Sequence, residues 1–326
     1  MAEGVLVIGE IQDGALVGIT QEMLGAGRRI AEAQGGLVNL ALFGEGAETL
    51  AQEGIVAGAD LVYTEDNAAL NDYLPERWLA AAQTAIDFAD PAVVLIGTTT
   101  AGRDLAPRLA FRLNTGLAVD ILSYEVDGEK VRWTRPCYGG AARAEVVING
   151  MPQIATVRSK SQEPLEPDAS RSGDTIPLAV ELPADEREKI LSKEIEEKEG
   201  IQLEDADVVV SGGRGLGGPE GFQVVEELAS VLGGAVGASR AACDLGWYPP
   251  SQQVGLTGKT ISPDVYIAIA ISGASQHMSG MAGSKNIISV NKDPDSNMVK
   301  SSRYAIIGDY KQVVPALISE IKKLKS

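Results

Sequence analysis

The sequence is poor in the side chains that most catalytic and metal sites require. Its 326 residues include one histidine, His277, and two cysteines, Cys137 and Cys243. A Ser-His-Asp triad needs its histidine beside both partners, and zinc needs several nitrogen or sulfur ligands. No such cluster surrounds His277, and the cysteines lie far apart without CxxC spacing. We therefore expect no catalytic residue, no metal site and two free thiols in a reducing cytoplasm.

Basic residues and long apolar runs are also scarce. Lysine and arginine number 28 against 45 acidic residues, which gives a formal net charge of −17. An acidic surface repels nucleic acid and anionic lipid, so neither is expected as a partner. No apolar run approaches the roughly 18 residues of a membrane helix, and "MAEGVLVIGE" lacks a secretory pattern. These absences predict a cytoplasmic protein without membrane insertion.

Glycine is abundant, with 37 residues that often end short apolar runs, whereas aromatic residues make up only 5 %. Apolar runs alternate with amphipathic patterns over residues 1–160. Strands are predicted at 4–10, 37–45, 59–65 and 92–97, and helices at 22–34, 75–89 and 98–113. The alternation predicts an N-terminal α/β domain with a parallel sheet. The turn Asp127-Gly128 predicts a hairpin and hence an antiparallel edge on that sheet.

The remainder of the chain divides into a linker and a second domain. Residues 161–205 are rich in proline, serine and acids, which predicts a linker region with a solvated charged helix over 184–200. Strand and helix patterns return over 206–326 and predict a doubly wound α/β domain.

Polar loops follow the predicted strands of this second domain. They contain Arg214, Ser239 and Arg240, residues 253–257 and 272–277, Asn291 and Asp309. In open α/β sheets ligands bind at the carboxyl ends of the strands, so we expect these loops to converge on one crevice. Backbone amides of "SGASQ" at a helix start suit a pyrophosphate.

Two nucleotide-binding patterns are incomplete. "GRGLGG" (213–218) follows a predicted strand and matches G-x-G-x-x-G, but the acid expected about 20 residues later is replaced by "GGAVGASR". "GLTGKT" (255–260) resembles the end of a P-loop, but Gln253 stands where that motif needs glycine. The glycines of the first pattern indicate a close backbone approach to a phosphate group or a neighbouring helix.

Several long motifs together resemble one family. "SGGRGLG", "VGASRAACDLGWYP", "QVGLTGKTISPDVYIAIAISGASQHMSGM", "IISVNKDP" and "YAIIGDYKQVVP" resemble, in order and spacing, the alpha subunit of electron-transfer flavoproteins. "GTTTAGRDLAPRLAFRLNTGLAVD" resembles the amino-terminal domain of the same family. The resemblance covers most of the chain and is weakest over 160–205.

The resemblance implies that the second domain binds FAD. It places Arg240 against the isoalloxazine ring, Thr257 near flavin N5, and His277 as a donor on the pyrimidine carbonyl side. The residues that it implies for cofactor binding are Arg214, Ser239, Arg240, Gln253, Val254, Gly255, Leu256, Thr257, Ser272, Gly273, Ala274, Ser275, Gln276, His277, Asn291, Asp309 and Tyr310. The family often has glutamine where this chain has Leu256, so a side-chain contact there is in question.

The resemblance also implies an electron carrier rather than a self-sufficient enzyme. Arg240, Thr257 and His277 are expected to tune the flavin, because a cation and a donor beside the ring favour its negatively charged form. The implied partners are a beta subunit, braced by residues 1–160, and a dehydrogenase such as an acyl-CoA dehydrogenase. The beta subunit would hold AMP in a simple carrier, or a second FAD in a bifurcating complex with NADH and ferredoxin. Two other readings stay open: an NAD-dependent oxidoreductase subunit that uses "GRGLGG", and a flavin-free structural subunit.

Overall fold

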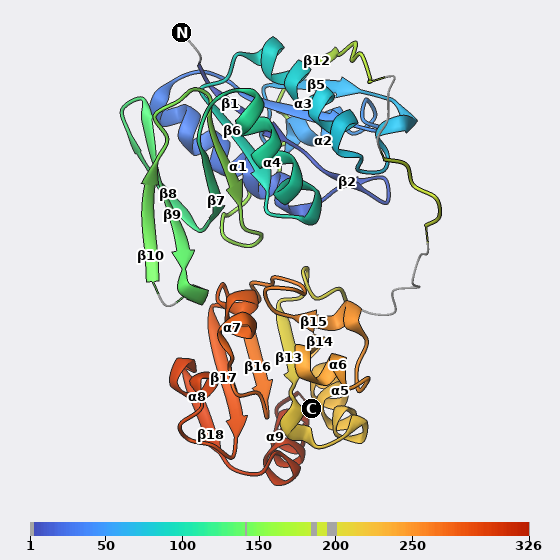
Figure 1. Cartoon of the computed structure of the whole chain (residues 1–326), viewed down its shortest axis with the longest axis vertical. Helices are drawn as coiled ribbons and strands as arrows, with labels where there is room; N and C mark the ends of the chain where they lie inside the picture. Colours follow the sequence, from blue (N-terminus) through green and yellow to red (C-terminus); the bar gives the residue numbers. More distant parts are fainter. Residues whose placement is uncertain (1–2, 141, 184–187, 194–200, 326) are drawn as a thin grey trace. The chain divides into compact units, whose positions relative to one another are not determined.

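The computed structural model describes residues 3–140, 142–183, 188–193 and 201–325. The chain folds as two compact units (Figure 1). Unit 1 comprises Met1–Pro136 and Arg143–Glu194, and unit 2 comprises Cys137–Ala142 and Ile195–Ser326. Each unit has its own parallel sheet and its own hydrophobic core.

Unit 1 is built on a seven-stranded sheet in the order β12-β5-β4-β1-β6-β11-β7 among the described residues. All its neighbouring strands pair in parallel. The strands are β1 (Val5–Ile8), β4 (Val38–Phe43), β5 (Leu61–Glu65), β6 (Val93–Gly97), β7 (Leu117–Ile121), β11 (Gln153–Val157) and β12 (Asp174–Pro177). Because β4 and β5 continue the sheet on one side of β1 and β6 on the other, the strand order reverses between β1 and β6.

Alternation within the strands gives the sheet of unit 1 two buried faces. Val5 and Val7 pack with helix α1 (Gly18–Gln34), whereas Leu6 and Ile8 pack with α3 (Pro75–Ala89) and α4 (Thr100–Arg112). Successive strand residues point to opposite faces, so continuous apolar strands are covered on both sides. Shorter elements complete this part: β2 (Ile11–Gln12), β3 (Ala15–Leu16), α2 (Ala51–Val56) and η1 (Ala68–Leu70).

The predicted antiparallel strands form a sheet of their own instead of an edge of the parallel sheet. Its order is β10-β9-β8, with β8 (Ser123–Asp127) antiparallel to β9 (Lys130–Cys137) through the predicted turn. The 3-10 helix η2 (Tyr138–Gly140) follows β9, and β10 (Ala142–Val147) comes next. Val131 and Trp133 of β9 are fully buried in the same hydrophobic cluster as the residues of α1. The antiparallel sheet therefore covers a face of unit 1, whereas an edge strand would extend the parallel sheet. The α/β class is as predicted, and the placement of the antiparallel strands is corrected.

The predicted linker region contributes to the fold of unit 1. Strand β12, at 174–177, pairs in parallel with β5 although all four of its residues are exposed. Of the predicted charged helix, residues 188–193 are not helical, and the rest lies outside the described residues. Ile190 and Leu191 are exposed there, so nothing buries an apolar face that would hold a short helix in water.

Unit 2 is a six-stranded parallel sheet in the order β15-β14-β13-β16-β17-β18, as far as its described residues show. Its strands are β13 (Val208–Gly212), β14 (Ala235–Ser239), β15 (Gln253–Val254), β16 (Val265–Ile269), β17 (Asn286–Asn291) and β18 (Tyr304–Ile307). Its helices are η3 (Arg214–Leu216), η4 (Pro219–Gly221), α5 (Phe222–Leu232), α6 (Arg240–Asp244), η5 (Pro250–Gln252), α7 (Ser275–Met281), α8 (Asn297–Ser301) and α9 (Tyr310–Lys325).

Helices cover both faces of this second sheet, which makes it doubly wound as predicted. Val210 and Ile267 pack with α5, α6 and α9, whereas Val209 and Tyr266 pack with α7 and α8. The strand order reverses between β13 and β16, which parallels the reversal between β1 and β6 in unit 1. Among the described residues, no helix is long and apolar enough to cross a membrane.

Candidate functional site

A cavity of ≈ 590 Å³ lies at the carboxyl edge of the sheet of unit 2. Its wall includes Arg214 after β13 and Ile271 after β16, the two strands between which the order reverses. A cleft at such a reversal is where open α/β sheets bind ligands, and the volume lies within the usual range for ligand pockets.

Most of the sequence-predicted site residues meet in this cavity. Those that line it are Arg214, Ser239, Arg240, Gln253, Val254, Gly255, Leu256, Thr257, Ser272, Ala274, Gln276, His277 and Asn291. They come from the ends of four neighbouring strands, the loop after β15 and helix α7. Because parallel strands end at the same edge of the sheet, segments separated by up to about 80 positions in the sequence line one cavity.

Four predicted residues are not among those that line the cavity. Gly273 packs on the backbone of Met298, and Ser275 is an exposed residue at the start of α7. Asp309 pairs with Lys292 at 3.1 Å, and the Lys311 amide and Lys292 hold the pKa of its carboxyl below the usual value.

Tyr310, the fourth of these residues, has a structural contact. Its hydroxyl donates to the carbonyl oxygen of Leu216 at 2.7 Å. It also lines a smaller hollow of ≈ 90 Å³, whose wall shares Gly215, Ala270 and Asn291 with the main cavity.

The loop after β15 is held against α7 by backbone contacts. The Leu256 amide donates to the Gln276 carbonyl at 2.8 Å, and the Ile261 amide donates to the Gly280 carbonyl at 2.7 Å. A Cβ on Gly280 would clash with the backbone of Gly255, whose φ of +149° itself favours glycine. This glycine pair lets the loop and the helix approach closely enough to form one continuous wall.

His277 is a buried residue of α7 rather than a residue of an exposed loop. It is 6 % exposed, and its Nε2 lies 2.8 Å from the hydroxyl oxygen of the fully buried Tyr266 on β16. Its Nδ1 is buried and has no hydrogen-bond partner among the described residues. Burial lowers the pKa of His277 to about 4, and the backbone of Val254 partly opposes that shift. The imidazole is therefore neutral near pH 7.

The charged and polar side chains of the cavity are accessible to a ligand. Arg240 begins α6 and pairs with Asp244 at 3.4 Å, and both side chains are about two-thirds exposed, so the pair leaves the guanidinium open to other contacts. Gln253 donates through Nε2 to the Thr257 hydroxyl at 3.0 Å. The Asn291 side chain is partly engaged, because its Nδ2 donates to the Ile271 carbonyl at 2.9 Å.

The "GRGLGG" segment serves the fold of the sheet edge. The Gly213 amide donates to the Ile269 carbonyl at 3.0 Å, and the Gly215 amide donates to the Ala270 carbonyl at 3.3 Å. A Cβ at either glycine would press on Ala270, at the end of the neighbouring strand β16. Gly213 and Gly215 therefore lie close to the end of strand β16, where the sequence had indicated a phosphate group or a neighbouring helix, and two amides that a pyrophosphate would need are already engaged.

Sequence reasoning missed several residues of this site. Asp244, Asp293 and Ser296 line the cavity, and Tyr266 contacts His277 from behind it. Tyr266 lies within an apolar strand and reads as an ordinary core residue, so the sequence offers no signal for its role. Asp293 and Ser296 belong to "NKDPDS", whose position after a strand was the one available hint.

At the corresponding edge of unit 1, polar side chains are bonded to one another. Thr99 caps α4 by accepting from the Gly102 amide at 3.0 Å, and its hydroxyl donates to Oε1 of Glu10 at 2.7 Å. Glu10 follows β1 and Thr99 follows β6, at the strand reversal. Burial raises the pKa of Glu10, and the Thr99 hydrogen bond partly opposes that rise.

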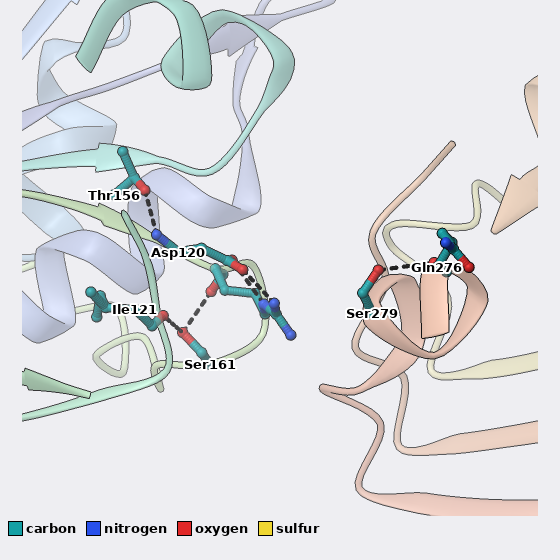
Figure 2. A network of polar contacts seen from close by, with 7 residues as sticks. Asp120, Ile121, Thr156, Ser161, Gln276 and Ser279 are labelled. Carbon is teal, nitrogen blue, oxygen red and sulfur yellow. Dashed lines mark hydrogen bonds and ion pairs between the residues drawn. The ribbon is translucent and has the colours of Figure 1, made fainter. Parts of the chain in front are cut away.

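A second polar group lies at the ends of β7 and β11. Arg158 is 4 % exposed and pairs with Asp120, to which its Nε donates at 2.9 Å. The Asp120 amide donates to the Thr156 hydroxyl oxygen at 2.7 Å, and the Ser161 hydroxyl donates to the Ile121 carbonyl at 3.4 Å (Figure 2). Figure 2 also draws the bond within α7 from the Ser279 hydroxyl to the Gln276 carbonyl. Within the described ranges, no cluster of histidine, cysteine, aspartate and glutamate could hold a metal ion.

Comparison with known proteins places both halves of the chain in one family. The model of the electron transfer flavoprotein domain matches residues 5–183. The model of the electron transfer flavoprotein FAD-binding domain matches residues 202–282, which contain most of the residues that line the cavity.

Curated relatives match over nearly the whole length of the chain. The electron transfer flavoprotein subunit alpha of Thermoanaerobacterium thermosaccharolyticum is 44 % identical, with 98 % of each chain covered. The subunit alpha of Bacillus subtilis is 42 % identical, with 99 % of each chain covered. A protein named FixB from Clostridium saccharobutylicum is 39 % identical over 99 % of this chain and 98 % of its own.

Proposed function

Because the chain belongs to the electron transfer flavoprotein alpha-subunit family, we propose that it binds FAD in the cavity of unit 2 and carries electrons as one subunit of a heterodimer. The observation that supports this most directly is the cavity itself. It lies at the strand reversal of a doubly wound sheet and inside the segment matched by the FAD-binding model. The family consists of electron-transfer subunits, so electron transfer is the role proposed for this member.

The residues of the cavity fit a flavin nucleotide in their chemistry. Arg214 and Arg240 supply cations, Ser239, Thr257 and Ser272 supply hydroxyls, and Val254 and Leu256 supply apolar surface. A flavin nucleotide combines a flat apolar ring with a polyhydroxyl chain and a doubly charged pyrophosphate, so it needs this mixture. FAD, when bound, would accept and release electrons in steps of one or two.

Each part of this wall has a role in the proposal. Arg240 places positive charge in the cavity and favours a bound ring that gains negative charge, because charge stabilisation is strong where water is excluded. Thr257, oriented by Gln253, offers a hydroxyl for a ring nitrogen, and His277 contributes a neutral ring to the same wall. Gly273, Ser275, Asp309 and Tyr310, which do not line the main cavity, are retained only for the polar end of the cofactor.

The partners proposed are a beta subunit and a flavoprotein dehydrogenase. At the strand reversal of unit 1 the Thr99 hydroxyl is bonded to the Glu10 carboxylate, which supports a bracing role against the beta subunit rather than a second ligand site. An acyl-CoA dehydrogenase is the proposed electron donor for a simple carrier, and NADH with ferredoxin for a bifurcating complex. The cytoplasm is the proposed compartment, which the two free cysteines support.

The NAD-dependent alternative has no support in the geometry. The Gly213 and Gly215 amides are bonded to carbonyls at the end of strand β16, and β14 ends at Ser239, followed by Arg240, where a ribose-binding acid would stand. The flavin-free alternative is tested together with the main proposal.

The decisive experiment is to purify the chain with a beta subunit of the family and to count nucleotides in the heterodimer. We expect tightly bound FAD, with one FAD plus AMP for a simple carrier and two FAD of different potentials for a bifurcating complex. Arg240→Ala should lower the flavin potential and weaken binding, whereas Arg303→Ala, which removes a cation stacked on Tyr304 outside the cavity, should change neither. A colourless heterodimer after incubation with excess FAD would overturn the proposal and leave the structural-subunit reading.

A further inference from the structure

Tyr266 is a buried residue of unit 2 whose hydroxyl the proposed function does not use. Its side chain is fully buried between the sheet and α7, and its hydroxyl lies 2.8 Å from Nε2 of His277. A phenol hydroxyl without a partner would be costly at such a position, so its single hydrogen must have a defined acceptor.

Two arrangements of hydrogen are compatible with this contact. Either the Tyr266 hydroxyl donates to Nε2 and the imidazole hydrogen lies on Nδ1, or Nε2 carries the hydrogen and donates to the phenol oxygen. In the second arrangement the Tyr266 hydrogen would need an acceptor other than His277. The two arrangements therefore differ in what surrounds each group.

The surroundings favour the first arrangement. Among the described residues, the Tyr266 hydroxyl has one hydrogen-bond contact, with Nε2 of His277, and the buried Ser211 hydroxyl on the neighbouring strand β13 has no hydrogen-bond partner. Nε2 is therefore the acceptor that this geometry offers to the Tyr266 hydrogen. Because a buried hydroxyl hydrogen needs an acceptor, Tyr266 donates to Nε2, and the hydrogen of the neutral imidazole lies on Nδ1.

We propose that Tyr266 is a positioning residue of this site: its hydroxyl donates to Nε2 of His277 and holds the imidazole neutral, with its hydrogen on Nδ1, in the wall of the cavity. The role of this ring toward a bound flavin rests on the proposed function, whereas the state of the ring itself does not. A neutral ring in one tautomer presents the same dipole in every molecule and adds no charge, so Arg240 and Arg214 remain the cations of the cavity.

The charged groups near His277 come from several elements. Arg214, Arg240, Asp244 and Asp293 line the same cavity, and Lys259 in the loop against α7 pairs with Glu204 at 2.7 Å. Helix α7 itself carries no charged residue. The titratable residue of η2 is Tyr138, whose side chain is exposed. Opposite charges are present in equal number in the cavity wall, so they do not by themselves select a protonated imidazole.

The single histidine of the chain makes the first test unambiguous. The flavin-free full chain, labelled with ¹⁵N-histidine, gives one pair of ring nitrogen signals. We expect a hydrogen on Nδ1 and an unprotonated Nε2 from pH 8 down to pH 5.5, with less than about one tenth of the rings protonated at pH 5.5 because the pKa is about 4. A hydrogen on Nε2, or a protonated ring at pH 7, would overturn the proposal even if Tyr266→Phe did not fold.

The variant Tyr266→Phe removes the donor and keeps the aromatic volume. Since the lost bond stabilises the neutral ring, the protonated fraction at pH 5.5 should rise several-fold and both tautomers should become populated. Tyr248→Phe, which removes a tyrosine hydroxyl outside the cavity, is the matched control and should leave the histidine signals unchanged. An unchanged spectrum in Tyr266→Phe would also overturn the proposal.

The flavin-loaded heterodimer supplies the second readout. The midpoint potential of Tyr266→Phe should move upward relative to the unaltered protein as pH falls from 7.5 to 5.5, because a positive imidazole forms beside the ring. The midpoint potential of the control Tyr248→Phe should differ from that of the unaltered protein by the same amount at both pH values. A chain that shows the Nδ1 tautomer but binds no flavin would refute the proposed function alone, and a flavin-binding chain with the Nε2 tautomer would refute this inference alone.

Discussion

The two parallel sheets of this protein present the same kind of edge and use it differently. In each sheet the strand order reverses beside the first strand, between β1 and β6 in unit 1 and between β13 and β16 in unit 2. Unit 2 has a cavity of ≈ 590 Å³ at that position. Unit 1 has the Glu10 carboxylate there, bonded to the hydroxyl that caps α4.

The difference arises from the residues that follow the strands. Small and hydroxyl residues such as Ser239 and Ser272 lie at or just after the ends of strands of unit 2 and leave room between the loops. In unit 1, Glu10 places a carboxylate at the start of a helix, where the partial positive charge of the helix and its cap would otherwise attract an anion. Arg158 and Asp120 fill the neighbouring strand ends with an ion pair. Topology thus defines where a ligand can bind, and the strand-end residues decide whether one does.

The largest effect is expected from breaking the ion pair of unit 1. Arg158→Met leaves Asp120 as an unpaired, mostly buried carboxylate, which should cost about 3 kcal/mol of stability in unit 1. Hydrogen exchange of the full chain should show lost protection in β7 and β11, with the strands of unit 2 unchanged. Arg108→Met, which breaks an exposed pair with Asp104, is the control and should cost less than about 0.5 kcal/mol. Equal effects of the two variants would mean that the buried pair does not hold this edge together.

The next effect concerns the wall of the unit 2 cavity. Gly280→Ala places a methyl group against the Gly255 backbone, which cannot move aside as a side chain would. Overpacking of this kind costs up to about 3 kcal/mol, and the gain in helix propensity of about 1 kcal/mol offsets part of it. We expect about 2 kcal/mol of destabilisation and a marked loss of flavin from the purified heterodimer.

The control for that change is Gly18→Ala, at the start of α1, where nothing lies within 4 Å of an added Cβ. It should retain full flavin content and full stability. Normal flavin content in Gly280→Ala would show that the close contact between the loop and α7 is not needed for the site.

Much of the fold could be predicted from local patterns. The helix predicted at 75–89 has those bounds in the structure, and α4 (Thr100–Arg112) lies within the predicted 98–113. Strand β12 could not be predicted, because its four residues are exposed and only pairing with β5 makes them a strand. The separate antiparallel sheet was missed for a related reason, since a hairpin pattern gives the turn but not the face on which the hairpin packs.

The site was predictable wherever it depends on strand ends. Arg214, Arg240 and Asn291 could be placed together because parallel strands end at one edge. The contact of Tyr266 with His277 could not, because α7 is too short to show a periodic apolar face and a Ser/Gly-rich segment resembles a loop. Tertiary packing alone buries His277 and lowers its pKa.

The smallest expected effect tests the carboxylate that fills the edge of unit 1. The raised pKa of Glu10 means that below about pH 4.5 both the folded and the unfolded chain hold its proton. As pH rises above that value, Glu10 ionises in the unfolded chain before it ionises in the folded chain. The free energy of unfolding therefore falls until the pH passes the pKa of Glu10 in the folded chain. Glu10→Gln keeps an acceptor for Thr99 and stays neutral, so it should gain stability relative to the unaltered protein between pH 5 and 7.5. The gain should be about 1.4 kcal/mol for each unit by which the pKa is raised.

Urea unfolding at the two pH values measures this difference, with the exposed Glu32→Gln on α1 as the control that should show none. A difference that stays constant with pH would mean that the Glu10 carboxylate is ionised as readily in the folded as in the unfolded chain. The edge of unit 1 would then be hydrated rather than filled, and the contrast with unit 2 would rest on the Arg158 pair alone.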